Sequence, residues 1–197
     1  MPSHRIRSLR SGRRHRSMMR VLAALVTLVV VILAAWAWFL MDKVYAPRTD
    51  PLPDDVDVMV QLGGASPPDY DAARAFAQAR HIPTLVISDP TGSPRAHDRY
   101  CGPLEGGRVS CFAPRPSDTR GEARNFATMA ADNGWRSAFV LGTGREHVER
   151  VRLYFSRCWD GELAVNRPPG DRPFLTHLKQ AVYQTAGWAR AEIDRQC

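Results

Sequence analysis

The sequence predicts a three-layer α/β domain with a mostly parallel sheet, preceded by one transmembrane helix near the amino terminus. Three observations support this fold class. Residues 21–41 form an uncharged apolar run, short strand-like runs recur after residue 55, and helical patterns separate those runs. Strands that alternate with helices favour a parallel sheet covered on both faces.

The basic residues are concentrated before the apolar run. The chain has a net charge of +7, and positions 21–197 hold 20 basic and 20 acidic residues, so the whole surplus lies in the first 20 residues. The surplus comes from seven arginines: Arg5, Arg7, Arg10, Arg13, Arg14, Arg16 and Arg20. Such a tail predicts a cytoplasmic amino terminus and an extracytoplasmic main domain. We expect no nucleic-acid partner, because a nucleic-acid-binding domain needs basic charge on a folded face and this domain has no net charge.

The apolar run has the length of a membrane span. Its 21 residues would extend about 30 Å as a helix, the thickness of the bilayer core. A secretory signal has a shorter apolar stretch, of about 7–15 residues. Ala46 leaves a weak cleavage site open, but the length favours an uncleaved anchor in the cell membrane. The predicted organisation is a tail (1–20), a span (21–41), a stiff linker holding the domain off the membrane (42–55) and the domain itself (56–197).

Beyond the linker, the predicted elements alternate. Apolar runs bounded by Gly or Pro predict strands at residues 56–62, 84–88, 109–112, 138–141 and 162–165. Helical spacing predicts helices at residues 70–80, 119–133, 146–157 and 173–195. The stretch 89–108 is rich in Pro, Gly, Asp and Arg and predicts a long loop. This order predicts a Rossmann-like domain.

Two of the helices carry more specific expectations. Thr119 and Glu122 fit a T-x-x-E capping box at the start of one helix, which favours a structural role for both. Along the last helix, Leu175, Leu178, Val182 and Ile193 predict an inward apolar face.

Ligands of parallel α/β sheets bind beyond the carboxyl ends of the strands. That rule selects Gly63-Gly64, Ser88, the stretch 117–122 and the stretch 143–147. Glycines after a strand let backbone amides approach an anion, although they also form ordinary turns. His147 and Arg150 share a helix face, where the imidazole could act as a base and the guanidinium could hold a phosphate or carboxylate. The alternative is a solvated helix start with a Glu146–Arg150 ion pair.

The cysteines are Cys101, Cys111, Cys158 and Cys197, and their spacing predicts no metal site. Outside the membrane, a disulfide between Cys101 and Cys111 is expected. Cys158 and Cys197 either pair with each other or stay free.

The site residues resemble those of the YdcF-like family, whose relatives include SanA-like and ElyC-like envelope proteins. The similarity rests on four segments. The first two are a predicted strand and glycine turn at residues 58–64 and the strand end Leu85-Val86-Ile87-Ser88. The other two are the helix start Thr119-Arg120-Gly121-Glu122-Ala123 and the segment with Thr143, Gly144, Arg145, His147 and Arg150, which has the pattern Thr-x-x-x-His-x-x-Arg. The chain departs from the family at Gly144, where Ser is usual, and at Glu122, where Asn is usual. The Arg-rich forms resemble an actinobacterial member.

The resemblance implies a Rossmann-like fold, binding of a nucleotide-like ligand or S-adenosylmethionine, and a role in cell-wall precursor metabolism. The expected function is therefore a membrane-anchored envelope protein whose outward domain binds a small anionic ligand, with transfer or hydrolysis on a phosphorylated precursor as the reaction class if it is an enzyme. The alternative is a non-catalytic interaction module on the same fold, which Gly144 and Glu122 favour. Protein partners are not predicted.

Overall fold

The computed structural model describes residues 5–89, 94–167 and 174–197, and it divides into two compact units, Met1–Leu40 and Met41–Cys197. The first unit is dominated by α1 (Arg5–Leu40). Together with the following turn, residues His15–Tyr45 include a window of mean hydropathy 2.6, long and apolar enough to cross a membrane. The predicted amino-terminal apolar helix is therefore present.

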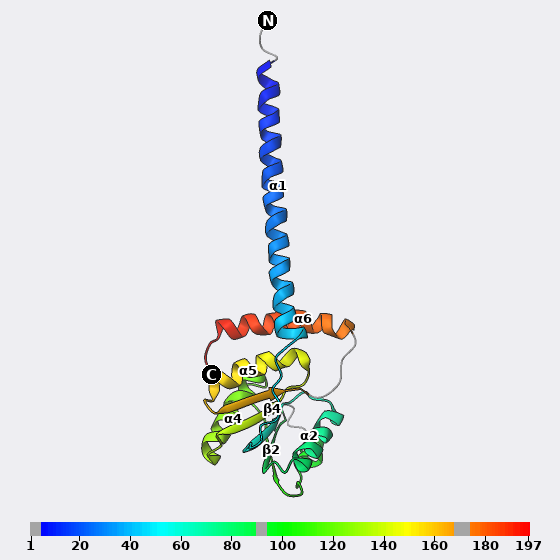
Figure 1. The fold of residues 1–197 in the computed structure, drawn as a ribbon, viewed down its shortest axis with the longest axis vertical. Helices are drawn as coiled ribbons and strands as arrows, with labels where there is room; N and C mark the ends of the chain where they lie inside the picture. The colour runs from blue at the N-terminus through cyan, green and yellow to red at the C-terminus, as the bar shows by residue number, and fades with distance from the viewer. Residues whose placement is uncertain (1–4, 90–93, 168–173) are drawn as a thin grey trace. The chain divides into compact units, whose positions relative to one another are not determined.

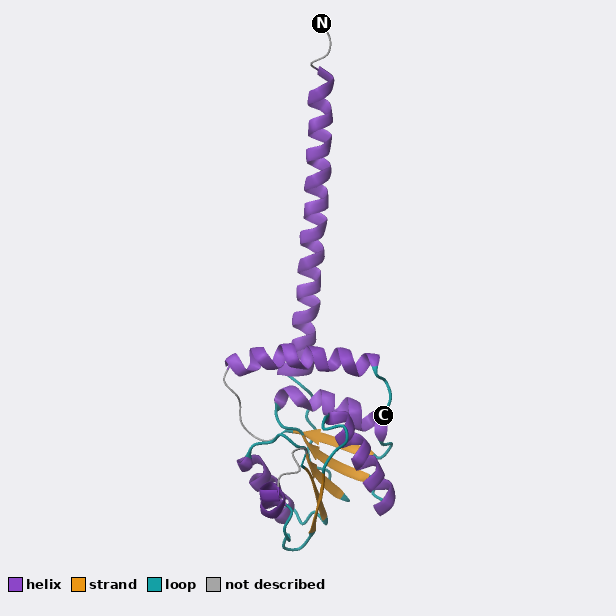
Figure 2. Cartoon of the chain, turned by 180° about the vertical axis from the view of Figure 1, so that it is seen from behind, coloured by secondary structure: helices purple, strands orange, loops and turns teal. Residues whose placement is uncertain are grey.

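The second unit is built on a five-stranded sheet in which every neighbouring pair of strands is parallel, in the order β3-β2-β1-β4-β5. The sheet lies between helical layers, as Figures 1 and 2 show. The elements are η1 (Met41–Tyr45), β1 (Val58–Gln61), α2 (Pro67–Ala79), β2 (Thr84–Ser88), α3 (Pro94–Tyr100), β3 (Arg108–Phe112), α4 (Thr119–Asn133), β4 (Ser137–Leu141), η2 (Arg145–His147), α5 (Val148–Cys158), β5 (Glu162–Asn166) and α6 (Phe174–Ile193). The three-layer parallel α/β prediction is confirmed.

Alternate side chains of each strand enter two separate cores, as the period of a strand requires. Val58 and Val60 of β1 pack with α4 and α5, where Phe126 and Phe155 are fully buried. Met59 points to the other face and packs with α2 and α3. The central strands β1 and β2 are buried along their whole length, which explains why their sequences are nearly continuous apolar runs rather than alternating ones.

Two predicted element boundaries are wrong. The predicted loop 89–108 contains the short helix α3. Helix α2 starts at Pro67, three residues before the predicted start, because Ser66 and Asp69 form a capping box and proline fits the first helical positions.

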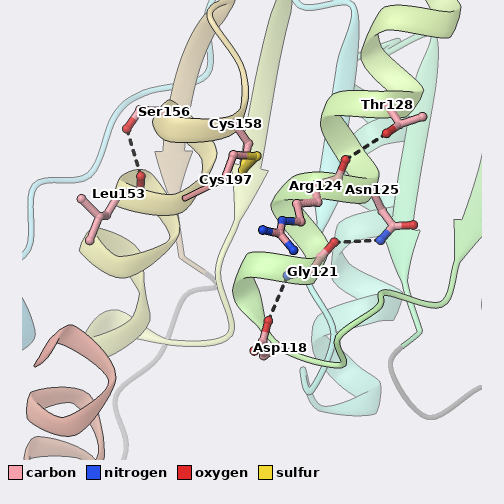
Figure 3. The surroundings of a disulfide bond; sticks show 9 residues. All are labelled: Asp118, Gly121, Arg124, Asn125, Thr128, Leu153, Ser156, Cys158 and Cys197. Atoms are coloured by element: carbon pink, nitrogen blue, oxygen red, sulfur yellow. Dashed lines mark hydrogen bonds between the residues drawn. A yellow bond between two sulfur atoms is a disulfide. The ribbon is translucent and has the colours of Figure 1, made fainter. Parts of the chain in front are cut away.

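The predicted capping role of Thr119 and Glu122 is also wrong. The N-cap of α4 is Asp118, whose carboxylate accepts a 2.9 Å hydrogen bond from the amide of Gly121 (Figure 3). Thr119 is already the first helical residue, so its hydroxyl and the Glu122 carboxyl are both directed elsewhere.

The inward face predicted for α6 differs from the observed one. Val182 and Ile193 are 61% and 87% exposed, whereas Ala181, Gln184 and Ala191 are buried. The side chains of Leu175 and Leu178 lie outside the described part. Helical periodicity identified a stripe of large apolar residues, but Ala181, Gln184 and Ala191 on the opposite side form the face that packs on the domain.

The predicted spacer 42–55 is bonded to the domain over much of its length. Val44 is 1% exposed, and Asp50 accepts hydrogen bonds from Arg152 and from the amide of Val165. Burial of Asp50 would raise its pKa, but these two bonds outweigh it and lower the pKa below its usual value. Much of the segment is therefore packed on the domain.

Both cysteine pairs form disulfides, Cys101–Cys111 and Cys158–Cys197. The first confirms the predicted loop closure. The second joins the end of α5 to Cys197, four residues beyond the end of α6 (Figure 3). Two disulfides agree with an oxidising, extracytoplasmic compartment.

Candidate functional site

The candidate site lies where the strand order reverses, between β1 and β4. Successive strands run outward from β1 through β2 to β3, and then from β4 to β5 on the other side. The loops after β1 and β4 therefore diverge at this point, which is where open α/β sheets place their ligands. The turn at Gly63 follows β1, and the segment from Thr143 to His147 follows β4.

Glu122, in the first turn of α4, is directed at the turn after β1. Its Oε1 accepts a 2.8 Å hydrogen bond from the amide of Gly63. The Ser88 hydroxyl is buried beside the carboxyl but, within the described residues, lacks the geometry of an ordinary hydrogen bond. Burial raises the pKa of Glu122 to about 7, although Ser88, the Gly63 amide and the Arg150 charge act in the opposite direction. Glu122 thus titrates near neutral pH.

His147 is held between two threonine hydroxyls. Its Nε2 lies 2.9 Å from Oγ1 of Thr119, and its Nδ1 lies 3.2 Å from Oγ1 of Thr143. The imidazole is 6% exposed. A hydroxyl hydrogen-bonded to an imidazole whose second nitrogen is held in place is the arrangement by which histidine activates a hydroxyl nucleophile. This chemistry is available to Thr119, which also borders a cavity.

Arg150 is a buried cation that faces this cavity. The residue is 9% exposed, and its Nε has no hydrogen-bond partner among the described residues. Its guanidinium lies 5.2 Å from the ring centroid of Tyr183. No ion pair joins Arg150 to Glu146 or to another carboxylate of the described chain, so the predicted alternative of a solvated Glu146–Arg150 pair is absent.

The cavity is open on one side, is lined by the start of α4, by α5 and by α6, and has a volume of about 220 Å³. Three arginines contribute to its wall, together with one carboxylate, and α6 supplies its outer side. The lining residues are Asp118, Thr119, Arg120, Arg150, Tyr154, Tyr183, Ala186, Gly187 and Arg190. Arg120 is paired with Asp194, and Arg190 lies 3.8 Å from Asp118. Arg150 makes no ion pair with a described carboxylate, and the nearest influence of this kind is Glu122, whose pKa the Arg150 charge lowers. An anion fits this charge balance.

Of the predicted site residues, Gly63, Ser88, Thr119, Glu122, Thr143, His147 and Arg150 come together at this edge of the sheet through the contacts above. Gly64, at φ +78°, forms the turn. Arg145 is directed away, toward the carbonyl oxygen of Tyr45 at 3.3 Å. The amide of Gly63, expected to meet an anion, is occupied by Glu122.

The sequence analysis missed the part of the site that α6 supplies. Tyr183, Gly187 and Arg190 line the cavity, yet they lie more than 30 residues after Arg150 and follow no strand. Tyr70 was also missed, and burial together with the Glu122 charge raises the pKa of Tyr70 to about 12. The small residue Gly187 was the available signal, because a Cβ there would lie 2.3 Å from the guanidinium of Arg150.

The charge of the site does not suit S-adenosylmethionine, because the three arginines in the cavity wall oppose the sulfonium cation. The size suits a phosphate or carboxylate group, either alone or as one end of a larger molecule.

Among the described residues, one cluster has the composition of a metal site. The ligand atoms of His97, Cys101 and Cys111 lie within 4.8 Å of one another. Both sulfur atoms belong to the disulfide, and a metal requires thiolates.

Comparison of the chain with protein-family models, with curated proteins and with solved structures finds no match.

Proposed function

We propose that the chain is a single-pass membrane protein of the cell envelope whose extracytoplasmic α/β domain binds a small anionic, phosphate-bearing ligand at the cavity beside Arg150. The amino-terminal helix is long and apolar enough to be the anchor. The seven arginines before it support a cytoplasmic tail, and the two disulfides support an outward domain. The pattern of Thr143, His147 and Arg150 supports kinship with YdcF-like proteins and a role in cell-wall precursor metabolism.

The observation that supports the ligand proposal most directly is the burial of the Arg150 guanidinium beside the cavity without an ion-pair partner among the described residues. A buried cation without a counterion is costly unless charge or hydrogen bonds compensate it. Arg150 is nine-tenths buried, has an unpaired Nε among the described residues, and borders a cavity. A phosphate in that cavity would accept from the guanidinium, and Arg120 and Arg190 would add to the positive field.

A direct test is calorimetric titration of inorganic phosphate into the full chain reconstituted in nanodiscs. Arg150→Gln is expected to weaken binding by about tenfold or more, since a hydrogen bond to a charged group contributes about 1.5–3 kcal/mol. The matched control is Arg136→Gln, which removes the same charge from an exposed arginine just before β4, at the opposite end of the strands. Equal affinity in the Arg150 and Arg136 variants would refute the site. Nucleotides and lipid-linked phosphates would then be ranked in the same assay.

A second candidate, a binding module without chemistry, is favoured by one observation. Glu122 and His147 both have internal partners, which can serve to hold the loops in place. This candidate predicts that His147→Ala complements a deletion strain in full. If Thr119 and His147 instead catalyse transfer or hydrolysis, His147→Ala should fail to complement the deletion strain while it keeps its affinity for phosphate.

The orientation has a separate test. Protease added to intact cells stripped of their outer layers should digest the domain and leave a protected fragment containing the tail and α1. Replacing the tail arginines in pairs with glutamine should reduce the fraction of correctly oriented chains. Full protection of the domain from external protease would contradict the outward location.

A further inference from the structure

The exposed large apolar side chains of the domain are concentrated on α6. Val182 and Tyr183 are each 61% exposed and Ile193 is 87% exposed. In the described part of residues 41–197, the other large apolar residues with comparable exposure are Met41 and Phe76, at 55% and 36%. Such a concentration on a single element indicates a contact surface.

The exposed residues form one stripe of the helix. Val182, Ala186, Ala189 and Ile193 follow at i, i+4, i+7 and i+11, and all four are exposed. This spacing places them on one face. The buried residues Ala181, Gln184 and Ala191 lie on the opposite side, against the domain. The outward face of α6 is therefore its more apolar face.

The connection of the domain to the apolar span places a bilayer close to α6. Lys43 lies in η1, and its Nζ is 5.9 Å from the ring centroid of Trp188 in α6. The apolar run ends at Met41, two residues before Lys43, which is at most about 8 Å of chain. The last residue of the apolar run is therefore connected by two residues of chain to Lys43, the residue that contacts the middle of α6.

The charges beside the stripe suit a lipid surface. Lys179 and Arg190 are exposed on α6, and the Arg190 side chain stays 66% exposed although it also lies 3.8 Å from Asp118. A basic residue near an anionic membrane contributes about 1 kcal/mol. The acidic residues at the end of the helix are paired within the domain, Glu192 with Arg157 and Asp194 with Arg120.

From these contacts we infer that α6 is an interfacial helix. Its stripe of Val182, Ala186, Ala189 and Ile193 lies in the boundary between headgroups and acyl chains of the bilayer that α1 spans, with Lys179 and Arg190 at the phosphates. This inference rests on the proposed membrane anchor. The cavity wall that α6 supplies then lies at the membrane surface.

The test uses the full chain in nanodiscs made of phosphatidylcholine and phosphatidylglycerol. The photoreactive residue benzoylphenylalanine replaces Val182 or Ile193, and lipid adducts are measured by mass spectrometry after illumination. The same residue at Val29, inside the apolar run, reports on the anchor. At Asp132 it serves as the control, because this exposed residue lies about 20 Å along α4 from Asp118, the neighbour of Arg190.

We expect lipid adducts at positions 29, 182 and 193 and none at 132. Adducts at 29 without adducts at 182 and 193 would overturn the inference and leave the anchor standing. Crosslinks from 182 or 193 to a second copy of the chain, in place of lipid, would overturn it as well and assign the stripe to a protein interface. Absence of adducts at 29 would refute the anchor and this inference together.

Discussion

Glu122 and Gly63 are 59 residues apart in the chain, and a 2.8 Å hydrogen bond from the Gly63 amide to the Glu122 carboxyl joins them. The bond connects the first turn of α4 to the turn after β1. The carboxyl is buried with Ser88 beside it and the charge of Arg150 nearby, so its protonation changes its interactions with groups from three segments of the site. Protein stability and ligand binding should both depend on the protonation of Glu122.

The pH dependence of stability should contain a contribution from Glu122. Burial raises its pKa in the folded protein to about 7, above the ordinary value of 4.5. The folded state then binds the proton more tightly than the unfolded state, so this contribution is fully present below about pH 4.5 and is lost as the pH rises to about 7. Its size is on the order of 3 kcal/mol.

Glu122→Gln keeps an acceptor for the Gly63 amide and cannot ionise. Denaturant unfolding of both proteins at pH 5 and pH 8 should show that the variant gains stability relative to the original chain at the higher pH. Parallel pH profiles for the two proteins would contradict a raised pKa at Glu122.

Gly187→Ala should weaken phosphate binding without weakening α6. An added Cβ would lie 2.3 Å from the guanidinium of Arg150, whose flexible side chain must then move out of its place beside Tyr183. Alanine also favours a helix over glycine by about 0.5–1 kcal/mol. The expected result is an unchanged or higher Tm together with an affinity for phosphate reduced as in Arg150→Gln.

Ala189→Gly is the matched control for this substitution. It changes an exposed residue of α6 outside the cavity wall in the reverse direction and should lower the Tm while retaining the affinity. A Gly187→Ala variant that binds phosphate as well as the original chain would show that the position of Arg150 does not determine binding.

The parallel sheet and the candidate loops were predictable from the sequence, because apolar runs bounded by Gly or Pro show where strands end and the topology rule selects the loops that follow. The directions of the side chains could not be predicted from the sequence. Asp118 and Thr119 are adjacent and both suit an N-cap, and only the packing that directs Thr119 to His147 decides between them. The contribution of α6 was hidden for a different reason. Its contacts with Arg150 cross more than 30 residues of chain and leave no local pattern apart from Gly187.

Loss of the Cys158–Cys197 disulfide should affect binding, whereas loss of Cys101–Cys111 should not. The first bond closes a separation of 39 residues and holds the end of α6, which forms the outer wall of the cavity. The second closes 10 residues, and neither of its cysteines lines the cavity. Loop-closure entropy gives about 4 and about 3 kcal/mol for the two bonds, so both serine double variants should unfold more easily.

Phosphate titration of the two double variants at a temperature where both are folded separates the effects. Weaker binding in Cys158→Ser/Cys197→Ser alone would support a cavity that depends on α6. Equal affinity in the two double variants would contradict that dependence.

Asp118 should oppose anion binding while it stabilises α4. Its carboxylate caps the amide of Gly121 and also lines the cavity, where it lies 3.8 Å from Arg190. Asp118→Asn keeps an N-cap oxygen and removes the negative charge, so phosphate should bind more tightly with little change in Tm. Asp118→Ala removes the cap as well, and the free energy of unfolding should fall by about 1 kcal/mol. Calorimetric titration and thermal unfolding of the two variants check both expectations, and weaker phosphate binding by Asp118→Asn would contradict repulsion between the Asp118 carboxylate and the bound anion.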